Sequence, residues 1–292
     1  WTAGSGAGAA VTSGTRGVAD MRIPYGIAFD STTNEVVVTQ NNGHVINRIS
    51  WAGRVNTFAG SGAAGAVGGL TLAAQFAGPT GARVDSAGVA FVAAHDSNCI
   101  FQITAGGTVS IIAGAYVANA YLEHTTGTSA RFFRPSDCAV TADDGTLYVS
   151  DRWNFRVRMV TLSGTFGTTL VAGDGSSGFI DGPTARLFYP HGLAIAGSGD
   201  IFVSEYNQGT IRRIAADHST TTTVAGTGAV GFTDGVGVLT QFDKPHGMDI
   251  DSNGFLFIAD YTNNAVRMLD TNTGLVTTHL TGINGPIGVC VD

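Results

Sequence analysis

A proline recurs along this chain at a nearly constant interval, and this period constrains the fold more than any other feature of the sequence. Successive members of the series are 55, 56, 55, 55 and 41 residues apart; they are Pro24, Pro79, Pro135, Pro190, Pro245 and Pro286. A large apolar residue stands three positions before each proline, and glycine stands two positions after five of the six. Such spacing predicts one structural unit that is repeated along the chain.

Each unit has the pattern of four β-strands. After each proline, apolar residues at the third and fifth positions give the period of a strand. A hairpin follows, clearest over residues 147–160, 201–214 and 256–269, and a further apolar run closes the unit, as in "TVSIIAG" at residues 108–114. No segment has a convincing helical period. Four antiparallel strands that recur around an axis predict the blades of a β-propeller.

Two long phrases carry a resemblance to a known family. "GDGSSGFIDGPTARLFYPHGLAIA" and "GTGAVGFTDGVGVLTQFDKPHGMDID", each followed by an acidic corner and a hairpin with arginine, resemble NHL repeats. The resemblance extends over nearly the whole chain, and six prolines imply a six-bladed NHL propeller: an all-β fold with four-stranded antiparallel blades, in a single domain over residues 1–292.

The ends of the chain are expected to share one blade of this propeller. Pro286 is followed by a single strand, while residues 1–4 have the pattern of an outermost strand. The shared blade is therefore either completed by residues outside this numbering or left incomplete.

Composition excludes several classes of partner. The net charge is -7 and there is no cluster of lysine and arginine, so we expect no nucleic acid partner. No apolar run is long enough to span a bilayer, so we expect no membrane insertion by this segment, although an anchor outside it is compatible with the sequence. We expect a monomer. Cys99 and Cys138 could form a bridge or remain two buried free thiols.

The residue directly after each proline is expected at the mouth of the central channel, because innermost strands begin at the face that carries the hairpins between second and third strands. These residues are Tyr25, Thr80, Ser136, His191, His246 and Ile287. The histidines come from adjacent repeats and should share one vestibule. Propeller enzymes similar to this chain hold zinc or calcium there, but a catalytic zinc needs about three protein ligands. We therefore predict no cofactor, with zinc or calcium at His191 and His246 as the alternative.

Acidic residues elsewhere in the repeats are given structural roles. Strand alternation predicts that Asp137 and Asp249 face neighbouring blades rather than the channel. Three carboxylates each precede an arginine by seven positions and predict inter-blade ion pairs or turn caps; the pairs are Asp151 and Arg158, Glu205 and Arg212, and Asp260 and Arg267.

The long connections favour a recognition surface. About 20 residues lead into each proline of the second to fifth repeats, well above the usual loop length. With the hairpin tips they predict a binding face that includes Tyr25, His95, Trp153, His191, Tyr206, His246 and Tyr261. We therefore predict a non-enzymatic propeller that binds a protein, peptide or glycan ligand, in an extracellular or cell-surface setting, with a cytoplasmic one as the alternative. The competing hypothesis is a metal-dependent lyase or hydrolase that acts at the channel mouth through His191 and His246.

Overall fold

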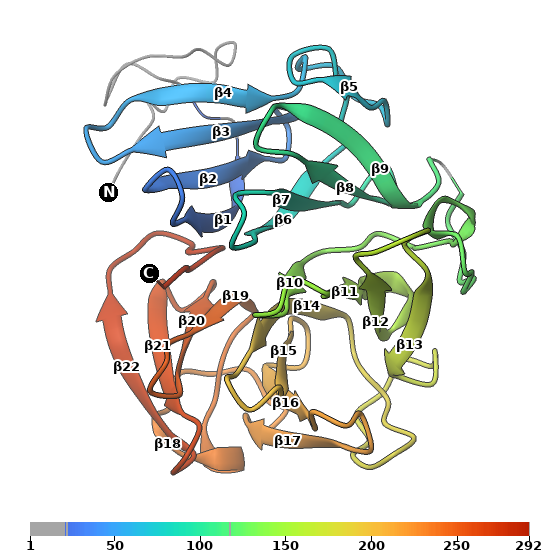
Figure 1. Cartoon of the computed structure of the whole chain (residues 1–292). Helices are drawn as coiled ribbons and strands as arrows, with labels where there is room; N and C mark the ends of the chain where they lie inside the picture. The colour runs from blue at the N-terminus through green and yellow to red at the C-terminus, as the bar shows by residue number, and fades with distance from the viewer. Residues whose placement is uncertain (1–20, 22, 117, 292) are drawn as a thin grey trace.

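Five antiparallel sheets stand around a common centre (Figure 1). The computed structural model describes residues 21, 23–116 and 118–291. Each sheet has four main strands in sequence order from the inside outward, and two sheets gain a short fifth strand at the outer edge. The prediction of an all-β propeller with four-stranded blades is confirmed. The prediction of six blades is wrong, because the described residues form five.

The strands of the five blades follow the proline period. Blade 1 contains β1 (Pro24–Asp30), β2 (Glu35–Gln40), β3 (Val45–Ser50) and β4 (Val55–Ala59). Blade 2 contains β5 (Gly69–Leu70), β6 (Pro79–Val84), β7 (Ala90–Ala94), β8 (Cys99–Ile103) and β9 (Thr108–Gly114). Blade 3 contains β10 (Cys138–Val140), β11 (Thr146–Asp151), β12 (Arg156–Thr161) and β13 (Thr168–Ala172).

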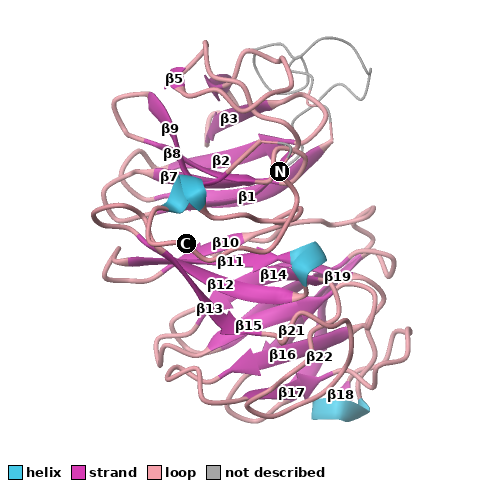
Figure 2. Ribbon diagram, turned by 90° about the vertical axis from the view of Figure 1, so that its right-hand side faces the viewer, coloured by secondary structure: helices cyan, strands magenta, loops and turns pink. Residues whose placement is uncertain are grey.

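Blades 4 and 5 repeat this order. Blade 4 contains β14 (Pro190–Ile195), β15 (Ile201–Glu205), β16 (Thr210–Ile214) and β17 (Thr221–Ala225). Blade 5 contains β18 (Gly235–Val236), β19 (Pro245–Ile250), β20 (Phe255–Asp260), β21 (Ala265–Asp270) and β22 (Leu275–Thr281). Short 3-10 helices lie in the connections (Figure 2); they are η1 (Gly127–Ser129), η2 (Arg152–Asn154) and η3 (Gly237–Leu239). No helix within the described ranges is long and apolar enough to cross a membrane.

The sixth proline contributes an innermost segment without a sheet of its own. The backbone N–H of Gly247, in β19, donates to the carbonyl of Ile287 at 2.8 Å. On the other side, a Cβ placed on Gly288 would lie 3.1 Å from the carbonyl oxygen of Tyr25, in β1. The C-terminal segment thus lies between blades 5 and 1 (Figure 1). The predicted outermost strand at residues 1–4 falls outside the described residues.

Glycine after the proline is required by the close approach of neighbouring innermost strands. A Cβ on Gly192 would lie 2.3 Å from the carbonyl oxygen of His246, and one on Gly26 would lie 2.1 Å from that of Thr80. Both neighbours are backbone atoms of the adjacent blade, so neither can move aside cheaply. The Pro-X-Gly phrase is therefore an architectural feature of the inner ring.

Gly192→Ala is expected to lower the free energy of unfolding by about 1–3 kcal/mol, because the added methyl group must push two blades apart. Urea denaturation measures the difference. Gly197→Ala is the matched control, since a Cβ there meets nothing within 4 Å. Equal stability of the two variants would contradict this account of the ring.

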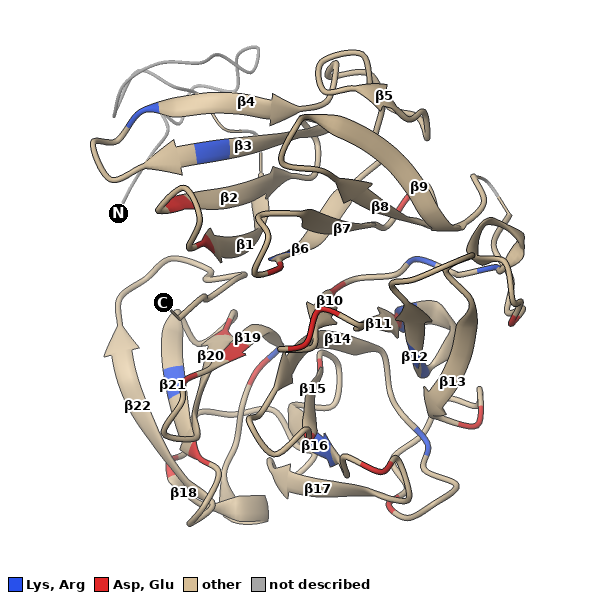
Figure 3. Cartoon of the chain, in the orientation of Figure 1, with Lys and Arg blue, Asp and Glu red and all other residues tan. Residues whose placement is uncertain are grey.

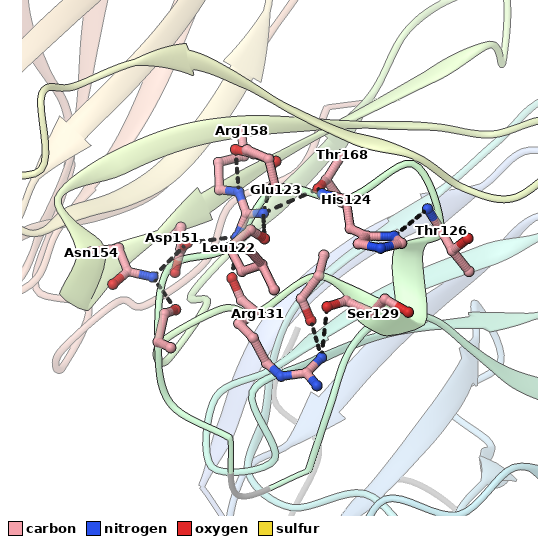
Figure 4. A network of polar contacts seen from close by, with 12 residues as sticks. Leu122, Glu123, His124, Thr126, Ser129, Arg131, Asp151, Asn154, Arg158 and Thr168 are labelled. Carbon is pink, nitrogen blue, oxygen red and sulfur yellow. Dashed lines mark hydrogen bonds and ion pairs between the residues drawn. The ribbon is translucent and has the colours of Figure 1, made fainter.

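Buried arginines tie the long connections to the blades that they enter (Figure 4). In blade 3, Arg158 Nη1 lies 3.0 Å from Asp151 Oδ2 of the neighbouring strand, and Arg158 Nη2 lies 2.8 Å from Glu123 Oε2 of the incoming connection. Asp151 Oδ1 also accepts the backbone N–H of Phe133 at 2.8 Å. The corresponding ion pairs join Arg212 to Glu205 and Asp181, and Arg267 to Asp260 and Asp234. These pairs lie within one blade and its incoming loop, so our prediction of inter-blade pairs is corrected; each carboxylate also accepts a backbone N–H of the incoming connection.

Part of each long connection runs along the outer edge of a blade. In blade 2, β5 pairs with the outermost strand β9, and in blade 5, β18 pairs with β22. These connections are therefore long partly because they add a short outer strand to a blade, and not only because they contribute to the face at the channel mouth.

The cores between blades keep the cysteines apart. Cys99 belongs to a cluster with Phe76 and Phe101, whose ring centroids are 4.8 Å apart. Cys138 belongs to the next cluster, with Phe91 and Phe132. Both thiols are buried and free, so the bridge that the sequence left open does not form.

Candidate functional site

Two histidines from adjacent blades meet at the mouth of the central channel. His191 and His246 each follow the proline that begins an innermost strand, β14 or β19. Their ring centroids are 4.3 Å apart, and the residues are 2% and 5% exposed. The proline period places both rings at the same height, so the shared vestibule expected from the sequence is present.

Three tyrosines surround this pair. The Tyr25 hydroxyl lies 2.9 Å from His191 Nε2, within hydrogen-bond distance. The Tyr206 ring lies 4.8 Å from that of His246, and the Tyr261 ring lies 5.2 Å from it on the other side. Five of the seven residues that we predicted for the binding face therefore form one cluster. Their role in ligand recognition stays a prediction.

The other two predicted residues make local contacts. The Trp153 ring packs against Phe133 and Tyr189, with centroid distances of 5.3 and 5.7 Å. His95 Nδ1 lies 2.9 Å from Asp96 Oδ1 in an ion pair of neighbouring residues. Neither side chain makes a ring contact with the histidine pair.

Burial keeps both imidazoles neutral. Desolvation, followed by the positive charges of Arg152 and Lys244, lowers the pKa of His246 to about 3. Desolvation also lowers the pKa of His191 well below its ordinary value, and the neighbouring His246 adds to this shift. Desolvation raises the pKa of Tyr25 to about 12. At neutral pH the mouth therefore holds two uncharged bases and a protonated phenol.

Each imidazole retains an unused nitrogen. Nδ1 of His191 and Nδ1 of His246 are buried and have no hydrogen-bond partner among the described residues. Buried polar atoms are nearly always paired in folded proteins. Two unpaired nitrogens on adjacent rings therefore mark this place as a site for a ligand or a reacting group.

Two cations at the mouth were missed by the sequence analysis. Arg152, in η2, lies with its Cζ 5.0 Å from the centre of the Tyr206 ring, and Lys244 Nζ lies 5.8 Å from the same ring. The signal was present in the sequence, since Lys244 is the single lysine and directly precedes Pro245. Arg152 directly follows Asp151, and the sequence analysis assigned a role to Asp151 and Arg158 but none to Arg152.

Arg83 forms the floor of the mouth. Its Nη2 donates to the carbonyls of Leu193 at 3.0 Å and Met248 at 2.7 Å, across the channel from its own strand β6. The space above it is about 20 Å³, and the cavity on its other side is about 210 Å³. The site is therefore a shallow mouth closed by Arg83.

The predicted orientation of two aspartates is wrong. Asp137 lines the mouth, although its Oδ2 also accepts the backbone N–H of Leu193 at 3.0 Å. Asp249 lines the lower cavity, with Oδ1 3.9 Å from Arg83 Nη2. Residues at the third and fifth positions after the proline pack between blades, so the fourth position, which Asp249 occupies, must face the channel.

The donors at the mouth do not match a three-ligand metal centre. Within the part of the chain that the structure describes, no three histidine, cysteine, aspartate or glutamate side chains lie close enough to hold a metal ion. The mouth offers two imidazoles and the Tyr25 phenol, whereas the Asp137 carboxylate accepts the backbone N–H groups of Cys138 and Leu193, so a third ligand of the usual catalytic zinc set is missing.

Comparison with known proteins supports an NHL-type propeller. The NHL repeat family matches residues 242–267, which extend from the end of the connection before β19 into β21. The chain is 26% identical over 291 residues to protein SUPPRESSOR OF QUENCHING 1, chloroplastic, of Arabidopsis thaliana. That alignment includes 90% of this chain and 27% of the relative, so the chain spans about a quarter of that protein's length.

Similar solved structures include two enzymes. A gluconolactonase from Xanthomonas campestris has a TM-score of 0.66 at 16% identity, with 92% of this chain and 79% of that chain covered. The catalytically inactive histidine-to-alanine variant of virginiamycin B lyase from Staphylococcus aureus, solved with quinupristin, has a TM-score of 0.58 at 15% identity, with 91% and 73% covered. Enzymes are thus among the proteins that share this fold, and our prediction of a non-enzymatic binding propeller is replaced by its enzymatic alternative, which stays a proposal. At identities this low the likeness shows the fold alone.

Proposed function

We propose that this propeller is a lyase or hydrolase that cleaves a carbon–oxygen bond at the mouth of its central channel. The observation that carries the proposal is the pair of buried, neutral imidazoles, His191 and His246, each with an unpaired Nδ1. Gluconolactonase and virginiamycin B lyase, which share the fold, supply the two reaction types.

His246 is the general base of this proposal. Its ring makes no hydrogen bond to the described residues, so its lone pair is free to take a proton from a substrate carbon or from water. A buried imidazole that stays neutral is ready to accept a proton at any pH above its lowered pKa. The removal of this proton starts elimination in a lyase and activates water in a hydrolase.

Tyr25 is the general acid. With the Nε2–H of His191 donating to the phenol oxygen, the Tyr25 hydroxyl proton is free for the oxygen that leaves. The raised pKa of Tyr25 keeps that proton in place until the bond breaks. One proton is thus taken by His246 and one is given by Tyr25, which balances the cleavage of a single carbon–oxygen bond.

A screen of sugar lactones and cyclic peptide esters tests the proposal. We expect turnover by the wild type and a loss of about 10²-fold in kcat/KM for Tyr25→Phe, which removes the acid. Tyr148→Phe is the matched control, because its hydroxyl also meets a histidine, with 3.0 Å to His218 Nε2, outside the mouth. Turnover that survives Tyr25→Phe undiminished, or its absence on both substrate classes, would contradict the proposal.

A further inference from the structure

The arginine at the mouth lacks the carboxylates that the other buried arginines have. Arg158, Arg212 and Arg267 each meet two carboxylates. Arg152 makes no ion pair or hydrogen bond through its side chain to the described residues; its Nε is buried without a partner, as are those of Arg212 and Arg267, so the missing carboxylates are what distinguish it. Burial lowers the pKa of Arg152, and the charged neighbour that adds to this shift is another cation, Arg134. An unpaired, partly buried charge is costly, which points to a missing anion.

The orientation of Arg152 leaves its donors available. The guanidinium lies over the Tyr206 ring at 5.0 Å, and its Cζ is 5.8 Å from the Tyr189 ring. A guanidinium held over a ring face keeps its N–H groups at the edge, where a planar or tetrahedral anion can accept two of them. Lys244, at 5.8 Å from the same Tyr206 ring, adds a second positive charge.

The carboxylates near the mouth do not neutralise these cations. Asp137 lines the mouth, but Arg83 is the cation that acts on it and its oxygens accept the backbone N–H groups of Cys138 and Leu193. Asp96 is paired with His95. Asp243 precedes Lys244 in the sequence, but the described residues show no ion pair between the two. The side of the mouth that contains Tyr206 therefore has a net positive charge.

We propose that the substrate carries an anionic oxygen group, a carboxylate or a phosphate, which Arg152 binds with the help of Lys244. The inference rests on the proposed function of the mouth. Tyr206 joins the two parts of the site, since its ring is 4.8 Å from His246 and 5.8 Å from His191. An anion on Arg152 places the neighbouring atoms of the same molecule at the imidazole pair, where the proton is removed.

Calorimetric titration of the whole chain with benzoate, phenyl phosphate and neutral benzamide tests the inference. We expect either anion to bind at least about 10-fold more tightly than benzamide, in line with a charge-assisted contact. The tighter of the two anions identifies the group as carboxylate or phosphate. Arg152→Gln should lose at least this factor for both, whereas Arg54→Gln, at an exposed turn between β3 and β4, should change neither.

Two further variants keep the test decisive. Arg152→Lys retains the charge without the planar fork and should keep part of the anion affinity, even if Arg152→Gln folds poorly. Tyr25→Phe should bind the anions normally, so the binding result stands whether or not turnover is found. Benzamide that binds as tightly as both anions, or anion affinity unchanged in folded Arg152→Gln, would overturn the inference.

Discussion

Replacing Arg83 by methionine is expected to lower the free energy of unfolding by about 3–5 kcal/mol, because it removes two close hydrogen bonds from a charged donor, each worth about 1.5–3 kcal/mol. Besides its bonds to Leu193 and Met248, Arg83 Nη1 donates to the carbonyl of Ile27 at 3.4 Å. One side chain therefore ties β6 to β1, β14 and β19 across the channel. Methionine fills a similar volume but leaves these carbonyls and the Asp249 carboxylate without their donor.

Arg83→Met should lower the free energy of unfolding more at pH 8 than at pH 5. Burial raises the pKa of Asp137 to about 6, and Arg83 opposes this shift. A carboxyl whose folded pKa lies above its unfolded value favours folding most when it is protonated, so its contribution declines as the pH rises through about 6. Without Arg83 the folded pKa rises further, and the charged carboxylate at pH 8 becomes more costly.

Urea denaturation at both pH values measures the effect of Arg83→Met. Arg213→Met is the control, because Arg213 is 44% exposed and its pair with Asp200, at 2.8 Å, lies at the surface. The loss of stability in Arg213→Met should stay below about 1 kcal/mol. A comparably small loss for Arg83→Met would mean that the central arginine does not hold the ring together.

The sequence predicted the blades because their determinants are local. Alternation of apolar residues and the proline before each innermost strand fix the strands within one repeat, and the glycine two positions later marks a contact that recurs from each repeat to the next. The blade count could not be obtained in this way. Pro286 repeats the local pattern but lies on a segment that forms no sheet of its own, so a count of prolines gives innermost segments rather than blades.

The residues that line the channel can be predicted only by comparing equivalent positions of the repeats. The fourth position after the proline carries a small residue in four repeats and a charge in two; the residues are Ala28, Arg83, Ala139, Ala194, Asp249 and Cys290. Opposite charges at equivalent positions of a ring predict a contact across it. Strand alternation was applied in the wrong phase to Asp249, since its immediate neighbours, Met248 and Ile250, are the residues that pack between blades.

The first two repeats carry other residues at the position of the ion pair. Asp151 and Arg158 are replaced in blade 1 by Gln40 and Asn47, whose side chains hydrogen-bond to each other. In blade 2 the same positions hold Ala94 and Phe101, both buried. Figure 3 marks the acidic and basic residues, which are few along the chain. The backbone geometry is kept while the chemistry changes, so a motif search that relies on the acidic corner misses these blades.

The pH dependence of turnover has the second large effect. A catalytic histidine with an ordinary pKa loses activity as the pH falls through about 6.5. His246, with its pKa lowered to about 3, stays unprotonated far below that pH, and Tyr25, with its pKa raised to about 12, stays protonated far above it. Asp137, whose pKa is about 6, accepts hydrogen bonds from backbone N–H groups and makes none to His246 or Tyr25, so we expect kcat/KM of the wild type to be flat between about pH 5 and pH 9.

His246→Gln should lower this plateau by about 10²–10⁴-fold without changing its shape, because glutamine is polar but cannot take a proton in this pH range. His218→Gln, which alters the histidine paired with Tyr148, should leave the plateau unchanged. The most direct measurement of the channel mouth as a reaction centre is thus the pH profile of kcat/KM for the wild type and His246→Gln. A flat wild-type profile with a uniform loss in the variant is the predicted result, and an acid limb near pH 6.5 or an active His246→Gln variant would contradict it.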